Sequence, residues 1–305
     1  MISSRSIQAE KVAHLKGHDG AIYTLLPTNN DHYFLSGGSD HMVVLWNELS
    51  MMPEAVLAKV PAVIYSLAYF DDYKRLAVGT SAGQIHIIDL ALKKEIHCLQ
   101  PSQSGIFDIQ FVPVQSKLLA LSGDGSFSLW DTNTLTCIAN VKITDKKLRQ
   151  AAIHPNETTA AVACGNNSIA IIDLSSGLMS KYFEAHTMSV NSLCFSPDGR
   201  FLLSGSRDAW LKVWDVQQHF SLHYEVPAHN FAIYSIVYSP DSQFFATASR
   251  DKTVKIWNAE DFSFLIRINK DKFDGHINSV NKIIWKKDYL ISAGDDRSIM
   301  LWKVS

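Results

Sequence analysis

The residue types that carry out catalysis are present in this 305-residue sequence, but nothing nominates a nucleophile together with its base. A hydrolytic serine on a sharp turn would require Gly-x-Ser-x-Gly, a phosphate-binding loop would end in Gly-Lys-Ser or Gly-Lys-Thr, and a metalloprotease would show His-Glu-x-x-His. The last two motifs are absent, and the one Gly-x-Ser-x-Gly match, at residues 79–83, is followed by no helical segment of the kind that a nucleophile turn needs. We therefore expect a protein that is not an enzyme.

Two pairs of histidines, His14 with His18 and His219 with His223, are four residues apart. On a helix this spacing would place both rings on one face, where they could bind a metal. Both pairs stand in segments with the pattern of strands and turns, and no third ligand accompanies either pair. We expect no metal site and no cofactor, because metal sites need several convergent ligands.

The cysteines and the apolar segments indicate the compartment. The four cysteines lack the spacing of a zinc site and stand in apolar runs, which predicts buried free thiols in a reducing compartment: Cys98, Cys137, Cys164 and Cys194. No apolar run approaches the ~18 residues of a membrane span, and residues 1–14 lack the apolar core of a signal peptide. We expect a cytoplasmic protein with no membrane contact.

Composition and charge narrow the class of partner. Hydrophobic residues make up 47% and charged residues 19% of the chain, which excludes a disordered or collagen-like protein. The 28 Lys and Arg against 30 Asp and Glu give a net charge of -2, so no overall field attracts nucleic acid.

The length exceeds the usual span of one hydrophobic core, so it predicts either two domains or an internal repeat that divides the core.

Tryptophan marks such a repeat. Trp46, Trp130, Trp214, Trp257 and Trp302 are separated by 84, 84, 43 and 45 residues. Halving each gap of 84 predicts further units at positions 88 and 172, which read Ile-Asp where the others have Trp-Asp, Trp-Asn or, at the end, Trp-Lys. Seven units of about 42 residues therefore end near 46, 88, 130, 172, 214, 257 and 302, a period typical of four-stranded propeller blades.

Each unit has the pattern of short strands, because apolar runs of four to seven residues are cut by turn clusters. The fifth unit shows this best. It predicts strands over 190–195, 201–204 and 211–214, with a tight turn at 196–199 and a more polar outer strand afterwards. The chain is therefore expected to be all-β.

The repeat resembles the WD40-repeat family over essentially its whole length. Four units carry the family's set of His, Ser or Thr, Asp and Trp: His18, Ser36, Asp40 and Trp46; His186, Ser204, Asp208 and Trp214; His229, Thr247, Asp251 and Trp257; His276, Ser292, Asp296 and Trp302. The resemblance implies a seven-bladed β-propeller of four-stranded antiparallel blades, formed as a single domain over residues 1–305. It also implies that these sets are structural, with the buried Asp accepting a hydrogen bond from the His ring, which is held by the hydroxyl and the indole N–H.

Three units depart from the set. Units two and four have Ile88 and Ile172 in place of Trp, Ala82 and Asn166 in place of Asp, and Val60 and Thr144 in place of His. Unit three keeps Asp124 and Trp130 but has Ser102 in the His position. We expect these units to rely on apolar packing and to be less rigidly tied.

The two ends of the chain predict how the ring closes. The last unit stops three residues after Trp302 and so lacks its outer strand, while residues 1–15 precede the first unit. We predict that this N-terminal segment is the outer strand of the last blade, which removes an exposed strand edge.

Residues outside the framework are candidates for a partner-binding face. The first position lies five residues after the His position, beside the central channel: Tyr23, Tyr65, Phe107, Arg149, Asn191, Tyr234 and Asn281. The second position lies two residues before the first position: Ala21, Val63, Gly105, Lys147, Ser189, Ala232 and Ser279. The third precedes the turn Asp: Ser39, Ser81, Gly123, Gly165, Arg207, Arg250 and Asp295. These positions resemble those through which WD40 proteins bind peptides and partner domains.

The function expected from this face is protein interaction. Lys147, Arg149, Arg207 and Arg250 cluster on units four to six, which favours an acidic or phosphorylated peptide or protein. We expect a non-catalytic scaffold, monomeric alone or a subunit of a hetero-complex. One alternative is a propeller that binds or transforms a small anion at the channel mouth; another is that these residues merely cap the channel and are solvated. The long segment 258–275 offers a further candidate contact loop.

Overall fold

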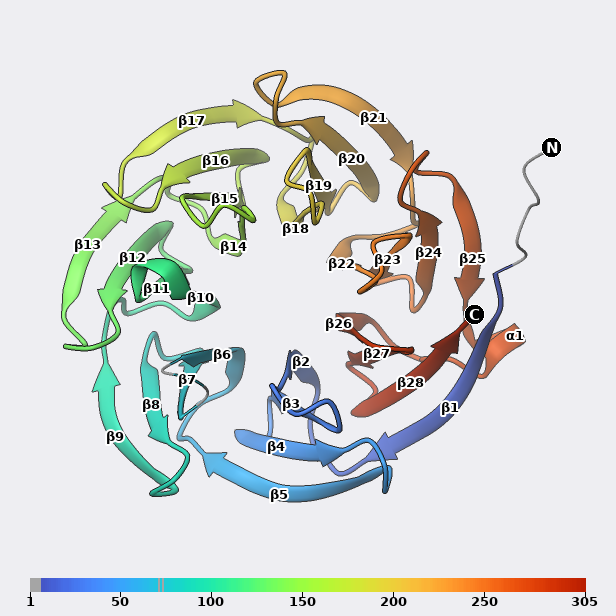
Figure 1. Ribbon diagram of the computed structural model, residues 1–305, viewed down its shortest axis with the longest axis horizontal. Coiled ribbons are helices and arrows are strands. Elements are labelled where there is room, and N and C mark those ends of the chain that lie inside the picture. The colour runs from blue at the N-terminus through green and yellow to red at the C-terminus, as the bar shows by residue number, and fades with distance from the viewer. Residues whose placement is uncertain (1–6, 71, 73) are drawn as a thin grey trace.

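The computed structural model describes residues 7–70, 72 and 74–305, and these form seven sheets arranged around a central axis (Figure 1). Each sheet has four antiparallel strands, ordered from the channel to the circumference. Successive sheets follow one another around the ring in chain order, and each packs face to face against the next. The predicted all-β, seven-bladed propeller is confirmed.

Within each blade the strands succeed one another from the channel outward. Blade one comprises β2 (Ile22–Pro27), β3 (Tyr33–Gly38), β4 (Met42–Asn47) and β5 (Met52–Lys59). Blade two comprises β6 (Ile64–Phe70), β7 (Arg75–Thr80), β8 (Ile85–Asp89) and β9 (Lys94–Leu99). Blade three comprises β10 (Ile106–Val112), β11 (Lys117–Ser122), β12 (Ser126–Asp131) and β13 (Cys137–Lys142). Blades four and five comprise β14 (Leu148–Ile153), β15 (Thr159–Cys164), β16 (Ser168–Asp173) and β17 (Met179–Glu184); β18 (Val190–Phe195), β19 (Phe201–Ser206), β20 (Trp210–Asp215) and β21 (Ser221–Pro227). Blades six and seven comprise β22 (Ile233–Tyr238), β23 (Phe244–Ser249), β24 (Val254–Asn258) and β25 (Phe264–Ile268); β26 (Val280–Lys286), β27 (Tyr289–Gly294), β28 (Ser298–Val304) and β1 (Ala9–Lys16).

Burial differs between the middle and the outer strands. Five of the six residues of β19 are buried, because both faces of a middle strand lie against neighbouring blades. The outer strand β17 instead alternates between exposed and half-buried residues, since one side faces solvent. This is why apolar runs mark the middle strands in the sequence, while the outer strands are more polar.

The hydrophobic core is divided among the seams between blades. One cluster joins Leu119 and Leu129 of blade three to Leu148 and Val162 of blade four, and another joins Phe34 of blade one to residues of the last blade. Each seam buries the apolar face of two sheets, so the free energy of burial is distributed around the ring. A chain of 305 residues therefore needs no single large core.

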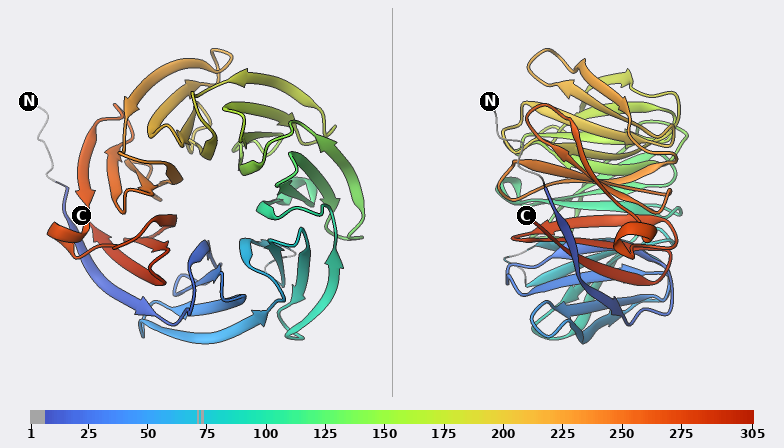
Figure 2. Two further views of the ribbon diagram at one scale, coloured as in Figure 1. Left: turned by 180° about the vertical axis from the view of Figure 1, so that it is seen from behind. Right: turned by 90° about the vertical axis from the view of Figure 1, so that its right-hand side faces the viewer.

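The ring is closed by the N-terminal strand, as predicted. β1 runs antiparallel to β28, with Ala9 opposite Val304 and Lys16 opposite Ser298. Figure 2 shows β1 following the circumference of the ring beside the C-terminal strands. Residues 1–6 of the predicted segment lie outside the described residues. The seventh blade thus combines both ends of the chain, and its pairing opposes opening of the ring.

The cysteines are not all buried. Cys164 is buried and Cys194 is half-buried, but Cys98 and Cys137 are exposed. The prediction of four buried thiols is therefore wrong for two of them. The reason is that Cys98 and Cys137 belong to outer strands, β9 and β13, whose outer side has no neighbouring sheet.

Candidate functional site

A hydrogen-bonded chain of four side chains fixes the loops at one end of each complete blade. In blade one, Trp46 Nε1 donates to Ser36 Oγ at 2.7 Å, Ser36 Oγ lies 2.6 Å from His18 Nε2, and His18 Nδ1 lies 2.7 Å from Asp40 Oδ2. Because an indole only donates, the serine hydroxyl accepts from it and gives its own proton to His18 Nε2. The Nδ1–H of His18 donates to the Asp40 carboxylate.

The same arrangement recurs in blades five, six and seven. The His Nδ1 to Asp distances are 3.1, 2.9 and 2.9 Å, and the His Nε2 to hydroxyl distances are each 2.8 Å. The indole donates at 2.9 Å in all three blades. The residues are His186, Ser204, Asp208 and Trp214; His229, Thr247, Asp251 and Trp257; His276, Ser292, Asp296 and Trp302.

Blade three keeps a shortened form of the set that the sequence analysis did not recognise in full. Ser102 Oγ donates to Asp124 Oδ2 at 2.8 Å and so replaces the histidine. Trp130 Nε1 donates to Ser128 Oγ at 2.8 Å, because Ala120 occupies the usual hydroxyl position and Ser128, which lies opposite Ala120 on the strand of Trp130 itself, supplies the partner. In blade two, Val60 and Ile88 are both buried in an apolar cluster.

These turns bring the second and third candidate positions together in every blade. In all seven blades the backbone N–H of the residue at the third position donates to the backbone carbonyl of the residue at the second position, at 2.8–2.9 Å. In blade six, for example, Arg250 N donates to Ala232 O. The framework therefore determines where the candidate side chains emerge, although it does not determine their identities.

Twelve of the 21 candidate residues line one cavity of about 570 Å³ at this end of the channel. It is formed by Tyr23, Tyr65, Phe107, Lys147, Arg149, Asn191, Arg207, Tyr234, Arg250, Asn281 and Asp295, together with Ala232. The cavity receives residues from each of the seven blades, so the sequence spacing placed them on one face. We call this surface the rim face.

Aromatic rings form a continuous row along blades one to three of the rim face. Tyr23 and Tyr65 meet edge to face at 5.6 Å between centroids, and Tyr65 stacks on Phe107 at 5.0 Å. Two cations continue the row, with Lys147 Nζ 5.1 Å and the Arg149 guanidinium 5.2 Å from the Phe107 centroid. Such contacts hold flat side chains in place and leave their polar atoms available to a partner.

Positive charge collects on blades four to six of the rim face. Lys147, Arg149, Arg207 and Arg250 form no ion pair with any described residue. Arg149 is half-buried, burial lowers the pKa of its guanidinium, and its Nε has no hydrogen-bond partner among the described atoms. Four cations without an ion pair in the described part of the chain leave this sector open to an anionic group.

The opposite side of the rim face carries an acid. Asp295 accepts a 2.7 Å hydrogen bond from Asn281 Nδ2, and burial together with the Asp295 charge raises the pKa of Tyr23. Asn281 also donates to Ile22 O at 2.9 Å, which ties blade seven to blade one. The rim face is therefore polarised, with cations on one side and a carboxylate on the other.

Exposed apolar residues beside this face were missed by the sequence analysis. Phe231 is 56% exposed, and the Arg250 guanidinium lies 5.9 Å from its ring centroid. Met188 holds the equivalent position in blade five, two residues after the His, and is 48% exposed. An apolar residue shortly after each of these His positions was the available signal. Such residues extend the contact surface outward from the cavity.

The long segment between blades six and seven lies elsewhere. It contains a single helical turn, α1 (Lys270–Phe273), which is capped by Asn269 Oδ1 accepting from Lys272 N at 3.1 Å. Asp274 pairs with Lys11 of β1, and Figure 1 places α1 at the circumference. The segment does not line the rim cavity, so the candidate contact loop is not part of the rim face.

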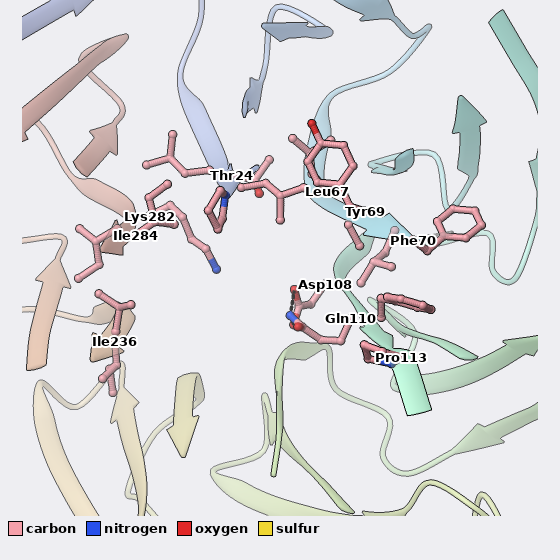
Figure 3. A pocket seen from close by; sticks show the side chains of 18 of the residues that line it. Thr24, Leu67, Tyr69, Phe70, Asp108, Gln110, Pro113, Ile236, Lys282 and Ile284 are labelled. Carbon is pink, nitrogen blue, oxygen red and sulfur yellow. Dashed lines mark hydrogen bonds between the residues drawn. The ribbon is translucent and has the colours of Figure 1, made fainter. Parts of the chain in front are cut away.

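A second cavity of about 500 Å³ opens among the later residues of the inner strands, such as Pro27 and Phe70, and Pro113, which follows β10 (Figure 3). Lys282 and Asp108 project into it from opposite sides. Burial raises the pKa of Asp108, against the opposing effects of the Lys282 charge and of hydrogen bonds from Ala151 N and Gln110 Nε2. Because its oxygens are already satisfied within the chain, Asp108 serves to link blades three and four.

A closed ring of four-stranded antiparallel blades, with one polar cavity at a mouth of its channel, defines a β-propeller. The family profile for the WD domain, G-beta repeat, matches residues 9–47, 177–215, 220–258 and 268–303. The chain belongs to the WD40-repeat family. The unmatched stretch includes blades two to four, where the hydrogen-bonded set is incomplete or absent.

Three curated proteins illustrate the similarity. The chain is 25% identical over 231 residues to Striatin-4 of Homo sapiens, which covers 69% of this chain and 31% of that protein. It is 31% identical over 112 residues to the Target of rapamycin complex subunit wat1 of Schizosaccharomyces pombe, which covers 36% of this chain and 35% of that protein. It is 24% identical over 191 residues to the Transcriptional corepressor LEUNIG_HOMOLOG of Arabidopsis thaliana, which covers 62% and 24%. The chain thus spans about a third or less of the length of these relatives.

Membrane insertion through a helix has no support in the structure. No helix among residues 7–70, 72 and 74–305 is long and apolar enough to cross a membrane.

Proposed function

We propose that this chain is a non-catalytic interaction module that binds an acidic or phosphorylated segment of a protein through its rim face. The observation that carries the proposal is the cluster of four cations on blades four to six, which have no counter-charge among the described residues. A partner with carboxylate or phosphate groups supplies that counter-charge and accepts charge-assisted hydrogen bonds from the arginines.

The aromatic row supplies the apolar part of the same interaction. Tyr23, Tyr65 and Phe107 are held by ring contacts, so they lose little conformational entropy on binding. A segment that places its acidic groups over Arg207 and Arg250 can lay an apolar side chain on this row. The combination favours a peptide or protein segment over a small inorganic anion.

The relatives are consistent with this role. The name of the Schizosaccharomyces pombe protein describes it as a subunit of a complex, and that of the Arabidopsis thaliana protein describes it as a corepressor. We infer that this chain likewise acts as a subunit of an intracellular, cytoplasmic complex, with the WD40 propeller spanning residues 1–305 as one domain.

The test compares partners recovered by the wild-type chain with those recovered by Arg207→Ala/Arg250→Ala. Both arginines are exposed, so the double variant is expected to retain the wild-type melting temperature. The matched control is Lys94→Ala, which removes an exposed cation from the outer strand β9. We expect one stoichiometric partner that is retained by the control and lost by the double variant.

Direct titration then tests the chemistry of binding. A segment of the recovered partner should bind at least about tenfold more weakly to the double variant, and its affinity for the wild type should fall as salt rises. Equal recovery by both proteins would refute the proposal. Stabilisation of the wild type by phosphorylated or carboxylate metabolites, without any protein partner, would instead support the small-anion alternative.

A further inference from the structure

Three side chains with metal-binding atoms converge on the third and outer strands of blade two. His86 lies on β8, and Glu95 and Cys98 lie on β9, where Cys98 is directly opposite His86 in the strand pairing. A register shift after Ile87 places Glu95 opposite Ile88. One ring nitrogen, one carboxylate oxygen and the thiol sulfur all lie within 4.8 Å of one another. Among the described residues, no second group of this kind exists.

His86 is the buried member of this group. Its exposed fraction is 4%, its Nδ1 lies 3.1 Å from Glu95 Oε2, and its buried Nε2 has no hydrogen-bond partner among the described atoms. Leaving such a polar atom unsatisfied is unfavourable, so an unpaired buried nitrogen requires an explanation. The glutamate alone does not supply one, because it occupies only one of the two ring nitrogens.

The propeller framework does not require a histidine here. The equivalent position, two residues before the Trp position, is occupied in the other blades by Val44, Ser128, Ala170, Lys212, Lys255 and Met300. Blade two also lacks the hydrogen-bonded set, since Val60, Ala82 and Ile88 replace its His, Asp and Trp. His86, Glu95 and Cys98 are therefore additional to the architecture that the seven units share.

The donor types select the kind of ion. An imidazole nitrogen, a thiolate and a carboxylate together suit Zn²⁺, whereas Mg²⁺ and Ca²⁺ prefer oxygen ligands alone. Bonds of about 2.0–2.3 Å in a tetrahedral site place such ligand atoms roughly 3.3–3.6 Å apart. His86 Nδ1 and Glu95 Oε2 are already 3.1 Å apart, and all three ligand atoms lie within 4.8 Å of one another, so small side-chain adjustments suffice. Cys98 is exposed and the Glu95 side chain is 44% exposed, so both can adjust their rotamers.

We propose that His86, Glu95 and Cys98 bind one Zn²⁺ ion, with the fourth coordination position open to solvent. The ion joins the outer strand of blade two to the strand beside it. It thereby supplies a cross-link in a blade that has no Asp–His–Ser–Trp set.

The test uses the full-length chain, treated with a chelator and kept under a phosphine reductant, and titrates it with Co²⁺ as a spectroscopic substitute for Zn²⁺. We expect one Co²⁺ per chain and a thiolate-to-cobalt charge-transfer band that added Zn²⁺ abolishes. Cys98→Ser should remove the band. The matched control is Cys137→Ser, because Cys137 is also an exposed thiol on an outer strand and should leave the band unchanged.

Competition with a chromogenic zinc chelator measures the contribution of the other two residues. Loss of a residue that only supports a metal ligand already weakens metal binding about 10–100-fold. His86→Gln and Glu95→Gln, which remove ligands, should therefore each weaken Zn²⁺ binding at least roughly tenfold. His97→Gln changes a neighbouring exposed histidine and should have no effect. Melting temperatures measured without metal establish that each variant is folded, and Zn²⁺ should raise that of the wild type.

Two results would overturn the proposal. One is the absence of a thiolate–cobalt band in the folded wild-type chain. The other is a band that depends on Cys98 but persists unchanged in His86→Gln and Glu95→Gln, which would show an isolated thiol capturing the ion.

Discussion

Lys286 Nζ lies 2.8 Å from Glu48 Oε1, and both side chains are more than nine-tenths buried. Lys286 ends the inner strand of the last blade, and Glu48 follows β4 in the first. The same ammonium donates to the carbonyls of Asp31 and Tyr33. This buried cluster and strand β1 both hold the last blade against the first.

The buried pair should contribute strongly to stability when one partner alone is removed. Lys286→Met leaves the Glu48 carboxylate buried without its counter-charge, which is expected to cost about 3–5 kcal/mol of unfolding free energy. Urea unfolding of the purified chain measures this loss. The exposed pair of Lys287 and Asp31 is the control, and Lys287→Ala should change the free energy by less than about 1 kcal/mol. Similar values for both variants would contradict a special role of the buried pair.

Deleting residues 1–15 should destabilise the ring, because it removes nearly all of β1. The deletion exposes the edge of β28 and uncovers apolar contacts of Ala13 and Leu15 in the seam between blades seven and one. A fall in melting temperature on the order of 10 °C or more is expected for a loss of several kcal/mol. Deletion of residues 1–6 leaves β1 intact and serves as the control. An unchanged melting temperature of the longer deletion would refute closure by β1.

Stability should fall as the solution becomes acidic. Burial lowers the pKa of His229 below its ordinary value of 6.5, against the opposing effect of Asp251. Burial alone would raise the pKa of Asp208 and Asp251, but the hydrogen bonds and charge interactions from His186 and His229, together with further hydrogen bonds to each carboxylate, outweigh it and hold both pKa values well below 3.8. In each case the unfolded chain binds more protons, so the unfolding free energy decreases as pH falls.

The loss should begin below pH 6.5, where His229 titrates in the unfolded chain, and continue below pH 3.8 as the aspartates protonate. Urea unfolding at a series of pH values measures the slope. His229→Gln should flatten the upper part of the curve, whereas the exposed His97→Gln should leave it unchanged. A wild-type free energy that stays constant down to about pH 4 would contradict this linkage.

Blades two and four should open locally more readily than blades five and six. Blade two has no hydrogen-bonded set, and blade four has Ile172 and Thr144 in place of Trp and His. With about 1 kcal/mol per missing hydrogen bond, the turn amides of these blades should exchange roughly tenfold faster or more. Hydrogen exchange on the chelator-treated chain measures this. Equal protection in all four blades would show that apolar packing compensates fully.

Much of the fold could be predicted because the relevant contacts are local within one repeat. Antiparallel pairing of neighbouring strands fixes the distance along the chain between His18 and Asp40, so a recurring spacing indicates a recurring hydrogen bond. The same periodicity placed Tyr23, Arg149 and Arg250 on one face, since equivalent positions in a ring of blades point to the same end of the channel. The residue types at these positions then indicated the charge of the face.

Other features depend on packing that no spacing within a repeat reveals. Trp130 takes its hydroxyl partner from Ser128 on its own strand β12, at a position that carries no hydroxyl in the four complete blades. The exposure of Cys98 follows from its place on an outer strand, and its approach to His86 follows from the register of β8 and β9.

The sequence by itself determined the number of blades, their strand order, the closure of the ring and the residues of the rim face, because each follows from a periodic pattern of local pairings. Only the tertiary structure decided which groups meet between blades or across strands without a repeated spacing, such as Lys286 with Glu48. The physical reason is that burial and ion pairing depend on side chains brought together from distant parts of the chain, and their distances are set by packing.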